Sequence, residues 1–280
     1  MWMSVVLWCA LAASLRAETG RDAWLRYAPL DENTARGYRQ RLPAAVAAFG
    51  DSPVVETARE EFLRGLRSML GRTPRLETGW PKESAIVLGT LEALGPDAGG
   101  PLPSEAFRLR WATRGPLRHL IIAGADPRGV LSGVFALLRR IALHQPIAPL
   151  DEQQAPYAPV RWVNEWNNLD GSIERGYGGR SIFFENDAVR EDLTRASEYA
   201  RLLASLGIQG CAVNNVNANP RVLSPEFLPQ LARLAAVFRP WGVRIAVSVD
   251  FGSPKTIGGL GTFDPLDVRV AAWWQAKAQE

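Results

Sequence analysis

Three polar loops, two of them glycine-rich, contain the side chains of this sequence that could do chemistry. The loops are residues 167–180, 214–219 and 250–261, and each follows an apolar segment. Carboxylates in such loops can transfer protons, and amides can hydrogen-bond hydroxyl groups. Asp170, Glu185 and Asp250 lie near the ends of the apolar segments, but their spacing singles out no catalytic pair. Because Asp and Glu commonly act as caps and surface charges, we expect structural roles for all three.

These loops belong to an alternating pattern of strands and helices. Apolar segments predict strands at residues 160–166, 208–215 and 243–250. Helical spacing of apolar residues predicts helices at residues 188–206 and 225–238, and a further helix near Asp264. This alternation implies parallel strands joined by right-handed crossovers. A doubly wound sheet or the start of a (β/α)8 barrel would fit, and in both the functional residues follow the carboxyl ends of the strands.

The first half of the sequence predicts a separate domain, residues 20–149. Its predicted helices are residues 34–49, 54–70 and 129–143, and its predicted strands are residues 84–89, 107–111 and 119–124. GADPRG, residues 124–129, lacks the motifs of a dinucleotide or phosphate loop, so we interpret it as a tight strand-to-helix turn. Residues 146–159 are rich in Pro and polar residues, which predicts a linker to a second domain, residues 150–280.

Composition excludes several classes of protein. The 280 residues are 47% hydrophobic and 22% charged, the balance of a folded globular chain. A net charge of +3 without runs of Lys or Arg gives no reason to expect a nucleic-acid partner. Two His and two Cys make a zinc site or a disulfide framework unexpected, and no metal or organic cofactor is predicted. We expect Cys211 to be a small buried apolar residue.

Residues 1–17, MWMSVVLWCALAASLRA, predict a secretory signal peptide. Their apolar run is too short to span a bilayer and ends in small residues, with cleavage expected after Ala17. Later segments do not reach the length of a membrane-spanning helix. We therefore expect an exported protein, periplasmic or extracellular, without a membrane partner.

Three long segments in the second half of the sequence resemble the sequences of one enzyme family. These segments are RWVNEWNNLDGSIERGYGGRSIFF (residues 161–184), YARLLASLGIQGCAVNNVNA (residues 199–218) and FRPWGVRIAVSVDFGSPKTIGGLGTFDPLDVRVAAWWQAKAQE (residues 238–280). They are similar to the α-glucuronidases of glycoside hydrolase family 67 over nearly all of residues 160–280. The first domain resembles the N-terminal α/β domain of that family mainly in order and length.

The resemblance implies an N-terminal α/β sandwich domain followed by the first three βα units of an incomplete (β/α)8 TIM barrel. It implies removal of (4-O-methyl-)glucuronic acid from glucuronoxylan-derived oligosaccharides with inversion, which needs a carboxylic acid and an opposed carboxylate. In the family the acid is the Glu of an NSEG-type word, which does not occur before Glu280. We therefore expect an N-terminal fragment without a catalytic residue of its own, from a full-length family in which a homodimer is a possible assembly.

The resemblance also assigns part of a substrate pocket. Trp166 matches an indole that packs against the uronic acid ring, and Val216 matches an apolar residue of the same pocket. Asn215 and Asn217 could bond sugar hydroxyls or tie the loop backbone together. For Asn214 we favour a role in loop structure.

The long first loop contributes three further candidates, Glu174, Arg175 and Tyr177. Arg175 could pair with a substrate carboxylate or form a salt bridge within the loop. One departure from the family pattern is Asn167, which stands where the family usually has Asp, so an acid is replaced by an amide of equal size. If that Asp orients an Arg, the substitution loses a charge-assisted hydrogen bond.

Two other interpretations of the sequence remain open. One is a non-catalytic carbohydrate-binding product, which would unfold cooperatively and bind uronate as an isolated chain. The other is a different TIM-barrel glycosidase, such as a hexosaminidase-like enzyme, because the order of two domains is shared. Substrate profiling of the full-length protein would separate these hypotheses.

Overall fold

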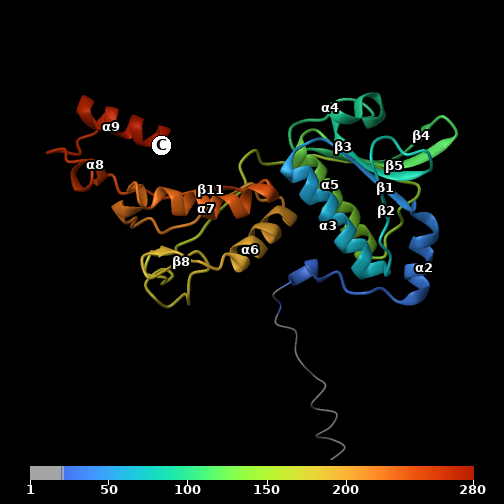
Figure 1. Cartoon of the computed structure of the whole chain (residues 1–280), viewed down its shortest axis with the longest axis horizontal. Coiled ribbons are helices and arrows are strands. Elements are labelled where there is room, and N and C mark those ends of the chain that lie inside the picture. The colour runs from blue at the N-terminus through green and yellow to red at the C-terminus, as the bar shows by residue number, and fades with distance from the viewer. Residues whose placement is uncertain (1–19, 21) are drawn as a thin grey trace, which may run out of the picture.

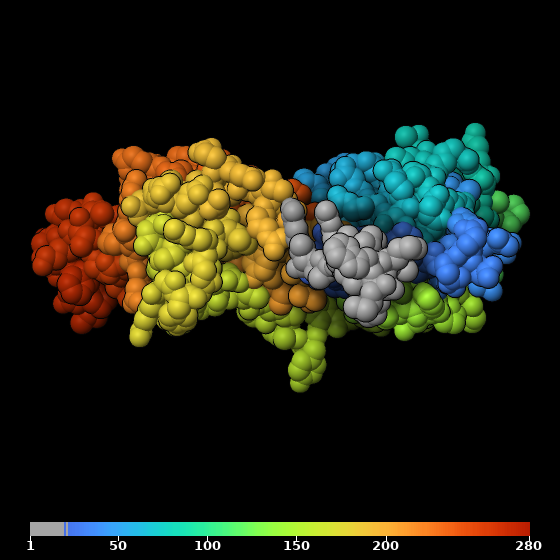
Figure 2. Space-filling view, turned by 90° about the horizontal axis from the view of Figure 1, so that it is seen from below, coloured from blue at the N-terminus to red at the C-terminus, as the bar shows by residue number. Residues whose placement is uncertain are grey.

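The computed structural model describes residue 20 and residues 22–280, so the predicted signal peptide lies outside the described residues. The described chain forms two lobes along one long axis (Figure 1). We call residues 20 and 22–154 the N-terminal lobe, and residues 155–280 the C-terminal lobe. Figure 2 shows the same end-to-end arrangement from a second direction, with the last residues at the tip of the C-terminal lobe.

The N-terminal lobe contains a mixed α/β fold. Its elements are η1 (Ala23–Arg26), α2 (Glu32–Arg41), β1 (Ala45–Phe49), α3 (Pro53–Leu70), β2 (Arg75–Glu77), β3 (Ala85–Thr90), α4 (Leu91–Leu94), η2 (Gly95–Ala98), β4 (Phe107–Arg114), β5 (Leu117–Gly124), α5 (Pro127–Ala142) and β6 (Asp151–Gln154). Its described strands form one sheet in the order β2-β1-β3-β5-β4-β6. β4 runs antiparallel to both of its neighbours, whereas the pairs among β1, β2, β3 and β5 are parallel.

The core of this lobe lies mainly between the sheet and two long helices, α3 and α5. Ile86, Leu88 and Ile122 project from the sheet into the same buried cluster as Phe62 of α3 and Val134 of α5. A smaller cluster covers the opposite face of the sheet beneath α4 and η2. Alternate strand residues point to opposite faces, so the sheet is buried on both sides.

The predicted helix at residues 34–49 is wrong in its second half. α2 begins at Glu32, directly after its N-cap Asp31, and ends at Arg41. The chain then enters the sheet as β1, between β2 and β3. Leu42 has an extended backbone, as expected for a residue that precedes proline, and Pro43 prevents the helix from continuing. The Ala-rich segment that follows has good helix propensity, but Ala45 and Val46 are fully buried as strand residues.

The other long elements of this lobe lie close to their predicted positions. Helices α3 and α5 and strands β3, β4 and β5 lie where the patterns predicted them, with ends shifted by a few residues. The segment predicted as a linker, residues 146–159, is not wholly irregular. It contains β6, which pairs antiparallel with β4. The N-terminal sheet therefore extends to Gln154, beyond the predicted boundary at residue 149.

The C-terminal lobe contains a short parallel sheet and its connecting helices. Its elements are β7 (Trp162–Asn164), β8 (Phe184–Glu185), β9 (Ala188–Val189), α6 (Thr194–Ser205), β10 (Gly210–Ala212), η3 (Pro220–Leu223), α7 (Leu228–Phe238), η4 (Arg239–Trp241), β11 (Arg244–Ala246), α8 (Ser253–Thr256) and α9 (Val268–Gln279). The sheet order is β11-β10-β7, and both described pairings are parallel. The predicted parallel arrangement is confirmed.

Two predicted helices of this lobe begin later than expected. Residues 188 and 189 belong to the β8–β9 hairpin, so α6 begins at Thr194 instead of residue 188. The hairpin turn, Asn186 and Asp187, has positive φ at both positions, as a two-residue type I′ turn requires. α7 begins at Leu228 instead of residue 225, after a turn stabilised by the Ser224 carbonyl.

One face of the parallel sheet packs against the helices of the lobe. Cys211 and Val213 are fully buried there, in the same cluster as Leu203 of α6 and Leu234 of α7. The prediction that Cys211 is a buried apolar residue is confirmed, and burial together with the nearby Glu165 carboxylate raises the pKa of its thiol to about 12. This buried cluster is continuous with the main cluster of the N-terminal lobe, so the two lobes share a core.

Candidate functional site

The carboxyl ends of the three parallel strands lie at one edge of the sheet. β7 ends at Asn164, β10 at Ala212 and β11 at Ala246, and the register aligns these residues across the sheet. Loops that leave the carboxyl ends of parallel strands border the crevice in which such sheets bind ligands. We therefore place the candidate functional site in the loops that follow β7, β10 and β11.

Asn214 joins two of these loops through its side chain. Its Nδ2 donates a hydrogen bond to the Ser248 carbonyl at 2.9 Å, and its Oδ1 accepts one from the Ser248 N–H at 2.6 Å. Asn214 is 2% exposed, so both hydrogen bonds are shielded from water. The preference for a role in loop structure is confirmed, and Asn214 fixes the loop after β10 against the loop after β11.

A cavity of about 210 Å³ lies between the loops that follow β7 and β10. Most of its lining residues carry an amide or a carboxylate: Asn167, Asn168, Leu169, Asp170, Asp187, Asn214, Asn215, Asn217, Ala218 and Asn219. An amide offers both donors and an acceptor, and a carboxylate offers acceptors, so the lining can bond several hydroxyl groups at once. The cavity is suited to part of a sugar or another polyhydroxylated ligand.

The structure brings the predicted residues Asn215 and Asn217 to this cavity. The Asn215 N–H donates to the Asn167 carbonyl at 2.9 Å and thereby joins the two loops. The Asn215 Oδ1 accepts from the Asn217 N–H at 3.0 Å, so this oxygen is used within the loop. Asn215 is buried and Asn217 is exposed. The loop therefore uses Asn215 for structure and leaves the Asn217 side chain accessible.

Trp166 and Val216 lie beside the cavity lining without belonging to it. Each is adjacent in sequence to lining residues, and the two are 40% and 56% exposed. The Trp166 carbonyl accepts a hydrogen bond from the Glu174 N–H at 2.8 Å, which anchors the start of the long loop. These two side chains supply exposed apolar surface next to the polar cavity.

The long loop after β7 is internally ordered. Isolated bridges join Asn167 to Ile173 and Ser172 to Arg180. The Asn168 side chain donates to Ser172 Oγ at 2.9 Å and to the Glu174 carbonyl at 2.8 Å. The loop folds back on itself through these contacts and presents its tip to solvent.

The three predicted residues of the loop tip lie outside the cavity lining. The Arg175 side chain is 87% exposed, and its Nε lies 3.8 Å from the Glu174 carboxylate. Partial desolvation and the same carboxylate raise the pKa of Tyr177. Glu174 itself has a left-handed backbone conformation, which turns the chain at the tip. Glu174 therefore connects the two neighbours electrostatically, and Arg175 is accessible to an anionic ligand.

Two lining residues, Asp187 and Asn219, were not selected from the sequence. Asp187 reaches the cavity because the β8–β9 hairpin folds back, with its N–H donating to the Leu169 carbonyl at 2.9 Å. The pair Asn186–Asp187 between two apolar segments was the available signal, since it favours a hairpin turn. Asn219 caps η3 by accepting a hydrogen bond from the Arg221 N–H at 2.9 Å.

The three carboxylates near the strand ends are used locally. Asp170 accepts hydrogen bonds from the N–H and Oγ of Ser172 at 2.8 and 2.7 Å, which lowers the pKa of Asp170. Asp250 accepts from the Gly252 N–H at 2.8 Å. Glu185 pairs with Arg190 at 2.9 Å and lies in the β8–β9 hairpin. These contacts agree with the structural roles expected from the sequence.

Residues 20 and 22–280 contain neither a cluster of metal ligands nor a membrane-spanning helix. In that part of the chain, no three His, Cys, Asp or Glu side chains gather in a way that could hold a metal ion. Nor does any helix described there have both the length and the apolar character that crossing a bilayer requires.

Comparison with known protein families matches both lobes. The N-terminal domain of glycosyl hydrolase family 67 matches residues 23–137, and the middle domain of the same family matches residues 140–280. Among solved structures, a 4-O-methyl-α-glucuronidase of family GH115 with specificity for decorated arabinogalactans aligns with a TM-score of 0.58. It is 18% identical and covers 85% of this chain and 34% of its own, so this likeness concerns the fold alone.

Curated relatives are similar along almost the whole chain. The probable α-glucuronidase A of Aspergillus fumigatus is 41% identical over 98% of this chain, and the α-glucuronidase A of Emericella nidulans is 41% identical over 96%. In both cases the chain covers 33% of the relative, so it spans about a third of their length. The family domains together cover nearly all of the described residues, and the chain therefore belongs to glycosyl hydrolase family 67.

Proposed function

We propose that the chain is the amino-terminal part of an α-glucuronidase that removes (4-O-methyl-)glucuronic acid from xylan-derived oligosaccharides by inverting hydrolysis. The observation that carries this proposal is the 41% identity to proteins named α-glucuronidase along almost the entire chain. The polar cavity at the carboxyl ends of β7 and β10 supports it, because its amides and carboxylates suit a hydroxyl-rich ligand.

The same proposal includes an incomplete (β/α)8 barrel in the C-terminal lobe, after an N-terminal α/β sandwich domain. Within the described residues, β7 and β11 each pair on one side, so the parallel sheet has two open edges. In β7, Val163 packs against the buried cluster, so Trp162 lies on the opposite face of the sheet, where it is 40% exposed. Further parallel strands beside β7 and β11 would pair both edges and cover this face.

Within the site, we assign Trp166 and Val216 to the apolar contact with the uronic acid ring. Asn217 would bond a sugar hydroxyl, and Arg175 would pair with a substrate carboxylate. The exposure of Trp166, Val216 and Arg175 supports these roles, since each side chain is free to meet a ligand. Asn215 would act mainly by holding the two loops together.

The acid and the base are assigned to parts of the protein outside these 280 residues. Inversion needs a proton donor and a water-activating carboxylate about 6.5–9.5 Å apart on opposite faces of the sugar. Three carboxylates near the site, Asp170, Glu185 and Asp250, are engaged by Ser172, Arg190 and Gly252. Each of these three carboxylates is bonded within its own loop or hairpin, and no two of them are arranged on opposite sides of the cavity as an inverting pair requires. Asp187 also lines the cavity, but one carboxylate supplies only one member of the pair.

The test is an assay of the full-length protein on aldouronic acids, with the anomer of the released sugar observed by NMR. We expect release of the β-anomer, which inversion from an α-linkage requires, and no turnover by the 280-residue chain alone. Properly folded full-length protein that released no uronic acid would overturn the proposal. Release of a hexosamine, or turnover by the 280-residue chain, would also contradict it.

We further propose that the protein is exported and that residues 1–17 are its signal peptide. The apolar run and small residues at the expected cleavage site support this proposal. N-terminal sequencing of the secreted protein should begin after Ala17, and an intact Met1 on exported material would contradict it. A homodimer of the full-length protein is proposed from the family, and light scattering would measure it.

A further inference from the structure

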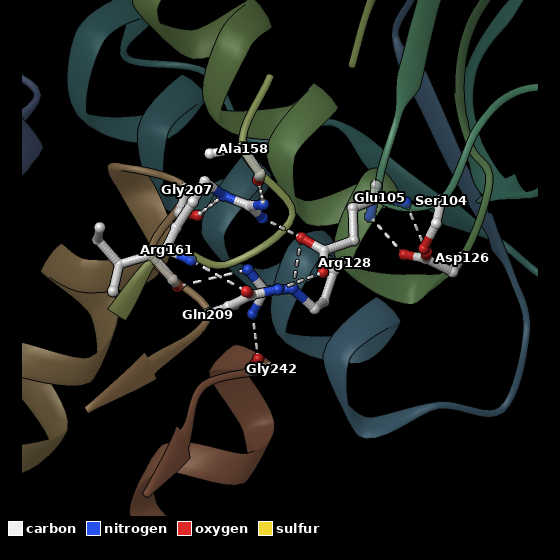
Figure 3. A network of polar contacts seen from close by, with 11 residues as sticks. Ser104, Glu105, Asp126, Arg128, Ala158, Arg161, Gly207, Gln209 and Gly242 are labelled. Carbon is white, nitrogen blue, oxygen red and sulfur yellow. Dashed lines mark hydrogen bonds and ion pairs between the residues drawn. The ribbon is translucent and has the colours of Figure 1, made fainter. Parts of the chain in front are cut away.

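The turn GADPRG, residues 124–129, joins β5 to α5, and its Asp126 side chain connects this turn to the segment before β4. Asp126 is the N-cap of α5, and its Oδ1 accepts a hydrogen bond from the Gly129 N–H at 3.0 Å. Its Oδ2 accepts from the Glu105 N–H at 2.7 Å and from Ser104 Oγ at 3.3 Å (Figure 3). One carboxylate thus caps the helix and fixes the backbone of Glu105.

Glu105 has an unusual backbone conformation for its residue type. Its φ is +60°, in the left-handed region that is strained for a non-glycine residue. Such a conformation persists when the surroundings determine it, and here the Asp126 side chain holds the Glu105 N–H. The conformation directs the Glu105 side chain away from its own lobe and toward the C-terminal lobe (Figure 3).

The Glu105 carboxylate has three partners at the boundary between the lobes. Its Oε1 accepts a hydrogen bond from Gln209 Nε2 at 2.8 Å. Its Oε2 pairs with Arg161 and lies 3.3 Å from Arg128 Nε. The side chains of Glu105, Arg128 and Arg161 are each 20% exposed or less, so these charges are poorly screened by water. We call these four side chains, Glu105, Arg128, Arg161 and Gln209, the Glu105 network.

The network contacts the chain just before each of the three parallel strands. Arg161 precedes β7, and Gln209 precedes β10 and accepts from the Arg161 N–H at 3.0 Å. Arg128 donates to the carbonyl of Gly242, which lies two residues before β11, and to the Ile208 carbonyl at 3.4 Å. A single carboxylate of the N-terminal lobe therefore holds the amino-terminal ends of β7, β10 and β11 together.

We propose that Glu105 is a positioning residue that fixes the relative stagger of β7, β10 and β11, and thereby the spacing of the loops at their carboxyl ends. Each strand is three residues long, so the sheet has few internal hydrogen bonds with which to hold its own register. The candidate cavity lies at the opposite end of the same strands. The N-terminal lobe thus acts as a template for the sheet, independently of which ligand the cavity binds.

Four backbone hydrogen bonds provide a direct readout. At the amino-terminal ends, Gln209 N–H donates to the Arg161 carbonyl and Arg244 N–H to the Gln209 carbonyl, at 2.9 and 3.0 Å. At the carboxyl ends, Glu165 N–H donates to the Ala212 carbonyl and Val213 N–H to the Ala246 carbonyl, at 2.8 and 3.0 Å. A local role of Glu105 would affect the first pair, whereas a positioning role must affect both pairs.

The experiment is residue-level hydrogen exchange on the full-length protein and on its Glu105→Gln variant, which keeps the size of the side chain and removes its charge. We expect exchange at Gln209, Arg244, Glu165 and Val213 to accelerate about tenfold or more, because hydrogen bonds to a charged group are lost. Amides of β3 should keep their rates. The matched control is Glu152→Gln, which breaks the 2.7 Å pair with Arg140 inside the N-terminal lobe and should leave all four amides unchanged.

Two results would overturn the proposal. One is wild-type exchange at Glu165 and Val213, whether or not Gln209 and Arg244 accelerate. The other is an equal acceleration of the β3 amides, which would show a loss of global stability alone. If Glu105→Gln does not fold, Arg128→Met replaces it, because it leaves the Glu105–Arg161 pair in place. That variant should accelerate exchange at Arg244 and Val213 more than at Gln209, and uniform or absent acceleration would contradict the proposal.

Discussion

Among single residues, Trp166 is expected to contribute most directly to ligand contact. Replacing Trp166 with Ala in the full-length protein should lower kcat/KM on aldouronic acids about fivefold, since an aromatic contact contributes roughly 1 kcal/mol. Trp162 is the matched control, because it is also 40% exposed and packs over Gly210 at the start of β7, whereas Trp166 follows the end of that strand. Trp162→Ala should leave kcat/KM within about twofold of the wild-type value. Equal losses in both variants would show a packing effect instead of ligand contact.

His119 predicts a pH dependence of stability. It is 1% exposed, and its Nδ1 accepts a hydrogen bond from the Ala85 N–H at 3.3 Å. Burial, assisted by Arg114, lowers the pKa of His119, whereas the unfolded chain has a value of about 6.5. The unfolded state therefore binds the proton more readily, so this contribution to stability is complete above pH of about 6.5 and is lost as pH falls below it.

The measurement is the thermal midpoint of the chain between pH 8 and pH 5. The wild-type midpoint should fall across the lower part of this range, and His119→Asn, which keeps an acceptor and removes the titration, should show a flatter profile. Parallel profiles for the two proteins would mean that another group controls the pH dependence.

The candidate site was accessible to sequence reasoning where its residues are close in the chain. Asn215 and Asn217 directly follow a segment that the sequence predicts as a strand, so their position at the carboxyl end of that strand, beside the cavity, could be predicted. Asp187 could not be placed in the same way, because its position depends on a two-residue hairpin that the helical periodicity obscured. The inward or outward direction of a loop side chain depends on hydrogen bonds such as Asn214–Ser248, which the sequence does not specify.

Among the elements, long helices were the easiest to predict and short strands the hardest. α3 and α5 repeat apolar residues over several turns, which specifies a helix independently of its neighbours. β1 is Ala-rich, a composition that by itself favours a helix, so its pairing with β2 and β3 decides that it is a strand. β6 is polar and lies in a proline-rich segment, and it becomes a strand because β4 offers an unpaired edge.

The junction of β5 and α5 gives an element-level prediction. A Cβ at Gly129 would lie 2.3 Å from the Ala106 carbonyl oxygen and 3.1 Å from Gly124 Cα, both of which are backbone atoms. Gly129→Ala should therefore lower the free energy of unfolding by about 1–3 kcal/mol, measured by urea denaturation. Gly37→Ala on α2 is the control, since its nearest neighbour would be Arg41 Nη1 at 3.6 Å.

The control should change stability in the opposite direction. Alanine is the better helix former, so Gly37→Ala should raise the free energy of unfolding by about 0.5–1 kcal/mol. If Gly129→Ala were as stable as the wild type, the close approach of α5 to the loop before β4 would not be a constraint on this residue.

At the scale of the whole molecule, the two lobes are joined by apolar and polar contacts together. The Trp24 ring meets Phe135 of α5 with centroids 5.8 Å apart, and its Nε1 donates to Ser205 Oγ of α6 at 3.2 Å. The Glu105 network lies at the amino-terminal edge of the parallel sheet, whereas Glu61 and Arg201 pair between α3 and α6. Because the lobes share one buried cluster, we expect them to unfold in a single cooperative transition.

The Glu61–Arg201 pair supplies the last prediction, which concerns the joint between the lobes. The Glu61 side chain is 0% exposed, and its carboxylate lies 2.7 Å from Arg201 Nη2 and accepts from the Tyr27 hydroxyl at 2.6 Å. Glu61→Leu leaves Arg201 buried without its partner, so the free energy of unfolding should fall by about 3–5 kcal/mol in urea.

Two further variants separate the charge pair from the size of the side chain. Adding Arg201→Met to Glu61→Leu should recover a large part of the loss, because an apolar pair of similar volume removes the unpaired charge. Glu60→Leu, on the exposed side of the same helix, should change the free energy of unfolding by no more than about 0.5 kcal/mol. If the double variant were no more stable than Glu61→Leu, the loss would come from Tyr27 and the backbone contact of Arg201 with Leu25 instead of the buried charge.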